Sequence, residues 1–315
     1  MGIEEFTKEI AERLQARMDG VNVTPMDNLK NNGVVAHGLL FRRDDEKVAP
    51  TLYVEQLYDL FKRDRLSVDA ILERIIRTYQ ELPAPNIPDM EEYLSSLELI
   101  NKINIRLLNL NRNLRMITER NLVAYRIKNS DMVCLFYITV SNDGDTIGEI
   151  ALSKTLMELY LPEYKTAEDL YNAVVSKVPS EVISLEPVAK FANQIIKERG
   201  FCMPPIPIEA NFLYVLTNNA RMHGASVILT EAGKKLIRER FPNGKLTVLP
   251  SSIHETLILE TAENESVEWL QEMVREVNAT QLDAVDYLSD NIYHLDVNTG
   301  ELVKATVDES EVEEE

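Results

Sequence analysis

The chain has 315 residues, of which 45% are hydrophobic and 27% are charged, a composition typical of a soluble globular protein. Its formal net charge is -19 at pH 7; six of these charges lie in the last nine residues, VDESEVEEE, so the rest of the chain still carries -13. An acidic body repels phosphate groups, which argues against general binding to nucleic acid or to anionic membranes.

The remaining composition predicts a cytoplasmic protein without disulfides, cofactor or membrane span. The two cysteines, Cys134 and Cys202, belong to no CxxC pair, so neither a disulfide framework nor a zinc knuckle is indicated. The N-terminus MGIEEFTKEI has acids where a secretion signal needs basic and then apolar residues, and no apolar run reaches about 20 residues. The tail 307–315 is predicted to be disordered.

Residues 1–82 are predicted to form a helix, a hairpin and two further helices. Apolar residues recur at helical spacing in 3–18 and 67–82, and Ser67 is a good N-cap for the second of these helices. The strands are expected within 34–43 and 48–58, joined by the charged turn DDEK, and another helix within 54–63.

A proline-rich stretch, LPAPNIPDM (82–90), separates this region from the rest. Proline disfavours both helix and central strand, so this stretch is the predicted boundary between the N-terminal region 1–82 and a main region 91–306. In the main region, apolar and alternating runs predict strands, and capped periodic runs predict helices. The strands are expected at 100–110, 121–127, 132–140 and 211–218, and the helices at 153–161, 166–178 and 186–198.

Two segments, 137–161 and 214–238, align without gaps and share four identities in 25 positions. Each is predicted to form a strand, a polar turn, a short strand and a helix, with Ser153 and Thr230 as equivalent N-caps. A true duplication and chance similarity of two hairpin-plus-helix units both remain open.

The C-terminal part predicts two hairpins around a helix. Strands are expected at 245–249 and 255–259, and a second hairpin at 291–305 with NTG as its turn. The helix 266–277 begins at Ser266, and its buried stripe is expected to contain Val267, Leu270, Val274 and Val277. Together the elements predict an α+β fold of mostly antiparallel hairpins covered by helices, and no nucleotide-binding glycine motif occurs.

Several long motifs resemble those of a known family. KNNGVVAHGL with APTLYVEQLYDLF, VLPSSIHETLIL, and VNATQLDAVDYLSDNIYHLDVNTGEL are similar to an uncharacterised family from gut Clostridia (Firmicutes), which is a domain of unknown function. FLYVLTNNARMHGASVILTEAGKKLI resembles, more distantly, the YtpQ-like family of Bacillus relatives. Neither resemblance implies an activity or catalytic residues; the first implies an association with mobile genetic elements.

The turn SSIHE (251–255) holds the only residues with the composition of a hydrolase site. A hydrolase needs a nucleophile, a base and a group that orients the base. In an extended chain Ser252 and His254 point to the same side and Glu255 to the other, so Glu255 could not orient His254, and no GxSxG elbow is present. Serines and a histidine that close a hairpin turn explain the same pattern, and this interpretation is preferred.

Other polar clusters are also explained by turns. The four histidines, His37, His223, His254 and His294, lack metal-ligand spacing, so no metal site is predicted. The loop TNNARMHG offers Asn219, Arg221 and His223 as low-ranking ligand-binding residues for an anion. The basic stretch 106–120 lacks interleaved aromatic residues, which makes a nucleic-acid surface the less favoured interpretation.

The sequence therefore favours a non-enzymatic interaction or regulatory protein with an unidentified protein or peptide partner. A hydrolase using Ser252 and His254 is the first alternative, and a nucleic-acid-associated protein is the second.

Overall fold

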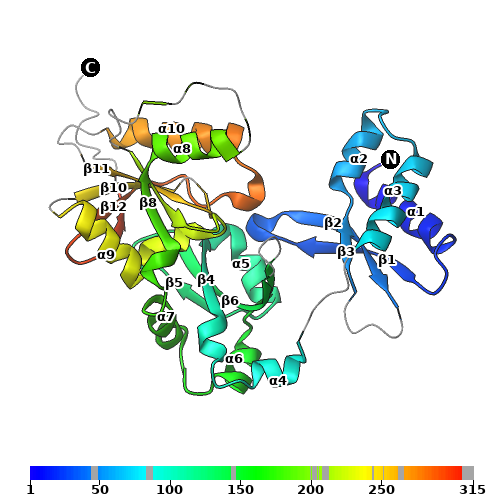
Figure 1. Ribbon diagram of the computed structural model, residues 1–315, viewed down its shortest axis with the longest axis horizontal. Coiled ribbons are helices and arrows are strands. Elements are labelled where there is room, and N and C mark those ends of the chain that lie inside the picture. The colour runs from blue at the N-terminus through cyan, green and yellow to red at the C-terminus, as the bar shows by residue number, and fades with distance from the viewer. Residues whose placement is uncertain are drawn as a thin grey trace. The chain divides into compact units, whose positions relative to one another are not determined.

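The computed structural model describes residues 1–43, 49–82, 88–142, 147–198, 200, 204, 206–207, 213–242, 245–250, 252–261 and 266–306. The chain divides into two compact units, Met1–Ile87 and Pro88–Glu315 (Figure 1). Each unit has its own sheet structure, and each is described by itself below. The acidic tail 307–315 and Cys202 lie outside the described residues.

The first unit consists of a three-stranded antiparallel sheet and three helices. Their bounds are α1 Ile3–Gln15, β1 Asn22–Leu29, β2 Val35–Arg42, β3 Thr51–Tyr53, α2 Glu55–Lys62 and α3 Val68–Glu81, with a 3₁₀-helix η1 at Asn31–Gly33. The strand order is β1-β2-β3. The core forms where Phe6, Ile10 and Leu14 of α1 meet one face of the sheet and the buried side of α3. Burial of these apolar side chains is the main stabilising term of the unit.

The three predicted helices of this unit are confirmed. Ser67 caps α3 by accepting a hydrogen bond from the Ala70 N–H at 3.3 Å. The buried side of α3 consists of Ile71, Leu72, Ile75 and Tyr79. The strand β1 was not predicted, because Pro25, Asp27 and Asn28 disfavour a strand locally. Its eight-residue pairing with β2 overrides that preference.

The second unit begins with a four-stranded antiparallel sheet. Its strands are β4 Ile103–Asn109, β5 Ala124–Arg126, β6 Met132–Asn142 and β7 Ile147–Ala151, and β6 pairs with the other three. The accompanying helices are α4 Met90–Leu94, η2 Leu99–Lys102, α5 Leu110–Glu119, α6 Lys154–Tyr160 and α7 Ala167–Val175. Cys134 of β6 is a free, fully buried thiol, and burial raises its pKa. The helix α5 was not predicted, because its sequence LNRNLRMITE buries only Asn113 and Met116.

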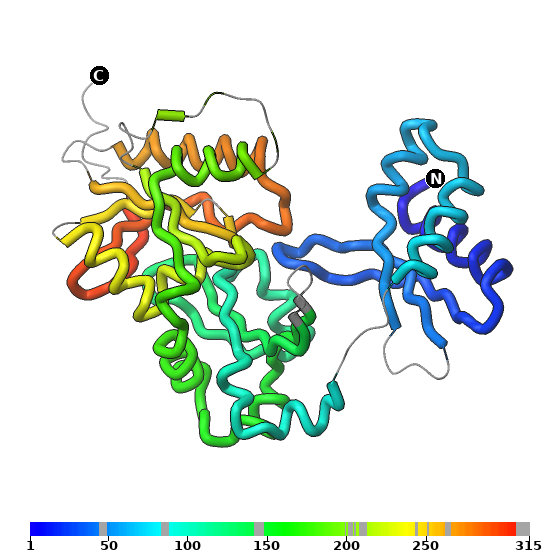
Figure 2. Tube along the Cα trace, in the orientation of Figure 1, coloured from blue at the N-terminus to red at the C-terminus, as the bar shows by residue number. Residues whose placement is uncertain are grey.

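A six-stranded antiparallel sheet, in the order β13-β12-β10-β11-β9-β8, completes this unit. The elements are η3 Ser180–Val182, β8 Ile183–Pro187, α8 Val188–Glu198, β9 Tyr214–Asn218, η4 Gly224–Leu229, α9 Glu231–Arg240, β10 Lys245–Leu249, β11 Thr256–Glu260, α10 Val267–Gln281, η5 Ala284–Asp286, β12 Tyr293–Asp296 and β13 Leu302–Lys304. Figure 2 traces this path from green to red. Leu270 and Val274 of α10 pack with Leu249 and Leu259 of the sheet. The predicted α+β class is confirmed, since helices accompany sheets in which every described strand pair is antiparallel.

Two details of the predicted pattern differ from the structure. In the second segment of the proposed duplication, 3₁₀-helix η4 stands where the first segment has strand β7, so the duplicated unit is not confirmed. Ser153 and Thr230 nevertheless cap α6 and α9 as expected. On α10, Val277 is 44% exposed and does not join the buried stripe. Among the described residues, no helix is long and apolar enough to cross a membrane.

Candidate functional site

The turn between β10 and β11 uses its polar side chains to hold itself together. The buried Ser252 hydroxyl donates to Glu255 Oε1 at 2.7 Å and accepts from the His254 N–H at 3.0 Å. The Ile253 N–H bonds to the Asp286 carbonyl at 2.9 Å, which fastens the turn to η5. Ser251 lies outside the described residues. The hydroxyl of Ser252 is therefore engaged with Glu255 and the backbone.

The His254 ring is fixed on both of its nitrogens. Nδ1 accepts a hydrogen bond from the His223 N–H at 3.1 Å, and Nε2 lies 3.2 Å from Asp286 Oδ1. The neutral ring therefore carries its proton on Nε2, the nitrogen that faces the carboxylate. The hydrogen bond with Asp286 raises the pKa of His254, and burial opposes this shift. Asp286 orients the His254 ring, as the acid of a hydrolase triad does. The lone pair on His254 Nδ1, however, accepts its hydrogen bond from a backbone N–H and not from a serine.

The loop that contains Asn219, Arg221 and His223 is anchored by the first two. Asn219 Nδ2 donates to the Glu181 carbonyl at 2.8 Å. Arg221 Nη1 donates to Glu198 Oε2 at 3.0 Å, and its guanidinium lies 4.7 Å from the Phe191 ring centroid. Of the three residues proposed to contact an anion, His223 is the one that lines the cavity described below.

His223 adopts a left-handed backbone conformation with φ 53, as Arg221 does. Such a conformation is uncommon for residues other than glycine and often accompanies functional positions. The ring of His223 stacks on that of His254, with 5.4 Å between centroids. Its Nδ1 is buried and has no hydrogen-bond partner among the described residues. Burial, followed by the positive charge of Arg106, lowers the pKa of His223 to about 3.

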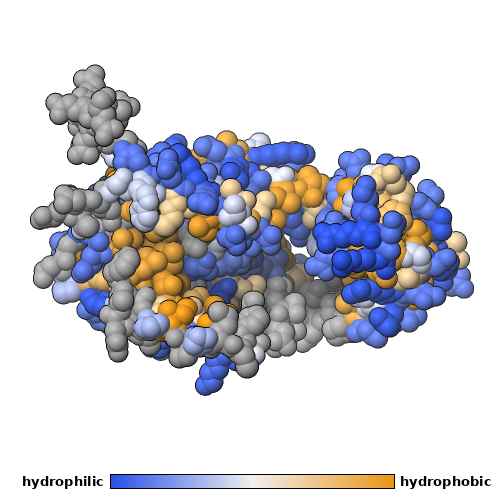
Figure 3. Space-filling view, turned by 90° about the horizontal axis from the view of Figure 1, so that it is seen from above, coloured by the Kyte–Doolittle hydropathy of each residue, from blue (hydrophilic) through white to orange (hydrophobic). Residues whose placement is uncertain are grey.

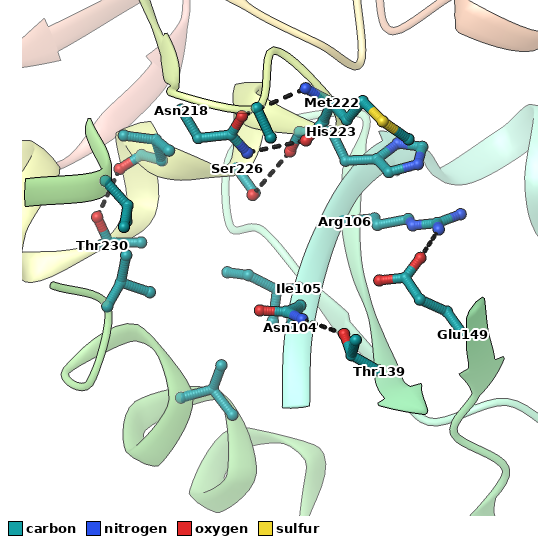
Figure 4. A pocket seen from close by; sticks show the side chains of 15 residues that line it. Asn104, Ile105, Arg106, Thr139, Glu149, Asn218, Met222, His223, Ser226 and Thr230 are labelled. Carbon is teal, nitrogen blue, oxygen red and sulfur yellow. Dashed lines mark hydrogen bonds and ion pairs between the residues drawn. The ribbon is translucent and has the colours of Figure 1, made fainter. Parts of the chain in front are cut away.

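The cavity beside His223 has a volume of about 210 Å³ and lies between the four-stranded sheet, α7 and the segment 218–230 (Figure 4). Its polar lining includes Asn104, Arg106, Thr139, Glu149, His223 and Ser226. Its apolar lining includes Val174, Val178, Val182 and Val227. Polar groups from three strands and one loop thus converge on a single concave space, which is the usual form of a small-ligand site.

Strand register explains why the polar residues of β4, β6 and β7 meet. Asn104 and Arg106 alternate onto one face of β4, and Thr139 stands opposite Glu149 in the β6–β7 pair. Asn104 Nδ2 donates to Thr139 Oγ1 at 2.7 Å. Arg106 Nη2 forms an ion pair with Glu149, and the guanidinium lies 3.9 Å from the Tyr137 ring centroid.

The ion pair is largely enclosed, since the side chains of Arg106 and Glu149 are 17% and 14% exposed. The Nε of Arg106 is buried without a hydrogen-bond partner in the described part of the chain. A buried pair gains little stability over apolar residues of similar volume, because both charges lose their hydration. The pair therefore places two opposite charges on the wall of the cavity at little gain in stability.

One protein-family model matches residues 3–296 of this chain, and its description is a family of unknown function, DUF5688. The chain belongs to DUF5688. No curated protein and no protein of solved structure matches the sequence.

The other histidines of this DUF5688 chain lie elsewhere. His37 Nδ1 of β2 is 2.7 Å from Asp27 Oδ1, and His294 belongs to β12. No group of three or more His, Cys, Asp or Glu side chains among the described residues could hold a metal ion. Sequence patterns pointed to His223 and His254 but missed Glu149 and Asp286. The alternation of polar residues in 103–109 was the one signal that could have singled out Arg106.

The neutral state of His223 predicts a loss of stability in acid. The unfolded chain takes up a proton on this ring near pH 6.5, whereas the folded protein does so only near pH 3. Protonation therefore favours the unfolded chain below pH 6.5, and at pH 5 the effect amounts to about 2 kcal/mol. His254, whose pKa is raised in the fold, acts in the opposite direction. Its contribution to the free energy of unfolding is full below pH 6.5 and is lost as the pH rises through the pKa of the folded protein.

Urea unfolding at pH 7 and pH 5 measures this effect. Between pH 7 and pH 5, the free energy of unfolding of wild type is expected to fall by about 2 kcal/mol more than that of His223→Gln. Equal losses in the two proteins would show that His223 titrates normally in the fold.

Proposed function

We propose that this member of DUF5688 is a non-enzymatic interaction protein whose partner presents a basic segment with apolar side chains. The absence of a reactive centre is supported by the hydrogen bonds of Ser252 and His254. The hydroxyl donates to Glu255, and the imidazole is held between Asp286 and the His223 backbone. Nucleophilic catalysis requires a base that can accept the proton of the nucleophile, and this lone pair is already used.

The outer face of α10 carries the proposal. Trp269, the only tryptophan of the chain, is 63% exposed there. Exposed carboxylates at Glu268, Glu272 and Glu276 follow at intervals of four residues and so form one row along the helix, next to Trp269. Figure 3 looks down on the molecule from above the view of Figure 1 and shows hydrophobic patches among hydrophilic surface on the second unit. An exposed aromatic anchor beside like charges suits a partner of opposite charge.

The chain as a whole, with a net charge of -19, also attracts a basic partner. Opposite charges accelerate association and make binding sensitive to salt. The association with mobile genetic elements, implied by the resemblance of its motifs, stays a prediction.

Binding can be followed through Trp269. The probe is a synthetic 12-residue peptide of repeated Lys-Lys-Leu, and the matched control peptide has Glu in place of Lys. The basic peptide is expected to shift the tryptophan emission to shorter wavelength and to bind less tightly as salt is raised. Fluorescence anisotropy of the labelled basic peptide should show weaker binding by Glu272→Lys/Glu276→Lys than by Glu73→Lys/Glu81→Lys on α3. Equal binding by both double variants, or by both peptides, contradicts the proposed surface.

Catalysis is tested separately. Hydrolysis of p-nitrophenyl acetate, p-nitrophenyl phosphate and casein is compared between wild type and His254→Gln, and no difference is expected. Turnover that disappears in His254→Gln would establish a hydrolase and overturn the proposal.

A further inference from the structure

The cavity at Arg106 has two chemically distinct walls. On one side lies the ion pair of Arg106 with Glu149, next to the neutral ring of His223. The lining also contains four valines from other elements, Val174 and Val178 in or just after α7, Val182 of η3 and Val227 of η4. Figure 4 shows the side chains of Arg106, Glu149 and His223 on the same side of the cavity. A ligand that satisfies both walls must be charged at one end and aliphatic at the other.

Unpartnered polar atoms are concentrated in this lining. Among the described residues, four buried side-chain nitrogen or oxygen atoms have no hydrogen-bond partner, and two of them are Arg106 Nε and His223 Nδ1. Both residues line the cavity. Buried polar groups are almost always bonded, and two of these four exceptions belong to residues of one lining, which makes this cavity the candidate for a polar ligand.

The charges of the wall select the kind of ligand. Arg106 and Glu149 together are neutral, so a simple anion attracted by the guanidinium would also face the carboxylate. A simple cation attracted by the carboxylate of Glu149 would likewise face the guanidinium of Arg106. A molecule with a carboxylate and an ammonium group a few ångströms apart can place each next to the opposite charge, which gives two charge-assisted hydrogen-bonding contacts. The valines leave room for an aliphatic side chain.

We propose that this cavity binds a free zwitterionic amino acid with an aliphatic side chain. Its carboxylate contacts Arg106, its ammonium group contacts Glu149, and its side chain lies on the valines. The volume of about 210 Å³ is below the range of drug-sized cavities, in agreement with a ligand of this size. This site lies apart from α10, and the proposal is independent of the interaction surface described above.

Isothermal titration calorimetry on the full-length protein tests the ligand class. The probes are L-leucine, N-acetyl-L-leucine, which lacks the ammonium group, and L-leucinamide, which lacks the carboxylate. L-leucine is expected to bind with a Kd below about 1 mM, and each blocked compound at least about tenfold more weakly. The inference is overturned if L-leucine does not bind, or if either blocked compound binds as tightly.

Two variants locate the site. Glu149→Gln keeps the shape of the side chain and removes its charge, and Val178→Phe fills the apolar side of the cavity from a half-buried position. Both are expected to weaken L-leucine binding at least about tenfold. The control is Glu186→Gln, whose ion pair with Lys190 lies outside the cavity, and it should bind like wild type.

Circular dichroism establishes that each variant is folded before titration. If Glu149→Gln does not fold, Val178→Phe alone decides the location. Unchanged binding by a folded Val178→Phe overturns the assignment of the ligand to this cavity. None of these outcomes bears on the peptide surface of α10, so either proposal can fail while the other stands.

Discussion

Replacing Asp131 with alanine is expected to lower the free energy of unfolding by about 3–5 kcal/mol. The carboxylate accepts hydrogen bonds from Asn109 Nδ2 at 3.1 Å, Asn291 Nδ2 at 2.9 Å and Ser289 Oγ at 3.0 Å, and also from the Tyr293 hydroxyl. Removing the carboxylate therefore takes an acceptor from four donors at once, although Asn109 Nδ2 keeps its bond to the Leu288 carbonyl, and Ser289 and Tyr293 keep the bond between their hydroxyls.

The position of these donors explains the size of the effect. Ser289 and Tyr293 are fully buried, and the hydroxyl of Tyr293, whose pKa is raised chiefly by burial, stays protonated as a donor. Asn109 ends β4, whereas Ser289 and Asn291 precede β12 in the other sheet. Asp131 thus joins the two sheets of the second unit. Each buried donor that loses its acceptor costs about 1–3 kcal/mol, although the donors can partly rearrange.

Urea unfolding followed by circular dichroism gives the measurement. Asp131→Asn retains one acceptor oxygen and should lose less stability than Asp131→Ala. The control is Glu272→Ala, an exposed change expected to stay within about 0.5 kcal/mol of wild type. A loss below about 1 kcal/mol in Asp131→Ala would mean that the network does not hold the sheets together.

Sequence patterns predicted those parts of the fold that depend on neighbouring residues. The hairpin at 245–260 follows from two apolar runs around Pro250, and its strands pair antiparallel. The capping residues Ser67, Ser153 and Ser266 accept bonds from the helix N–H groups as their sequence context indicates. Caps and turns are local in the chain, so a short stretch of sequence contains the information.

Features that depend on distant residues were not predictable in the same way. The strand β1 exists because β2 pairs with it, against its own propensity. Arg106 and Glu149 are separated by 43 positions in the sequence, and only the β4-β6-β7 register brings them together. The basic residues in 106–120 were considered as a less favoured nucleic-acid surface. The structure places one of them in a cavity and others, such as Arg115 paired with Glu119, on an exposed helix face.

The SSIHE turn combines both cases. Its serine closes the turn locally, as the sequence indicated. Its histidine, by contrast, is oriented by Asp286, an acid from an element that the sequence did not mark. A histidine beside a serine in the sequence therefore says little about catalysis, because the group that completes or blocks a catalytic arrangement comes from elsewhere in the fold.

Gly224→Ala is expected to destabilise the protein by about 2–3 kcal/mol and to displace both histidines of the site. A Cβ at this position would lie 2.6 Å from the His254 carbonyl oxygen and 2.7 Å from the Asn218 nitrogen, and closer still to Thr217 Oγ1. Two of these three atoms belong to the backbone and cannot move without shifting the chain. Thr217 is also held, because its hydroxyl donates to the His254 carbonyl at 2.7 Å.

The displacement follows from the position of Gly224 between the two histidines. It comes directly after His223, whose N–H bonds to the His254 ring, and a Cβ on it would meet the His254 carbonyl oxygen. Any shift that relieves the contact must lengthen the hydrogen bond that fixes the His254 lone pair. Imidazole signals in NMR spectra are the suitable readout, because the chain has only four histidines. The signals of His223 and His254 should shift, whereas those of His37 and His294 should not.

The control is Gly2→Ala, where a Cβ would meet nothing within 4 Å. This variant should unfold at the same urea concentration as wild type and keep all four imidazole signals. If Gly224→Ala behaves like Gly2→Ala in both measurements, the close approach of Gly224 to the 252–255 turn does not exist in solution. In that case the engagement of His254 by backbone, which argues against catalysis, would lose its basis.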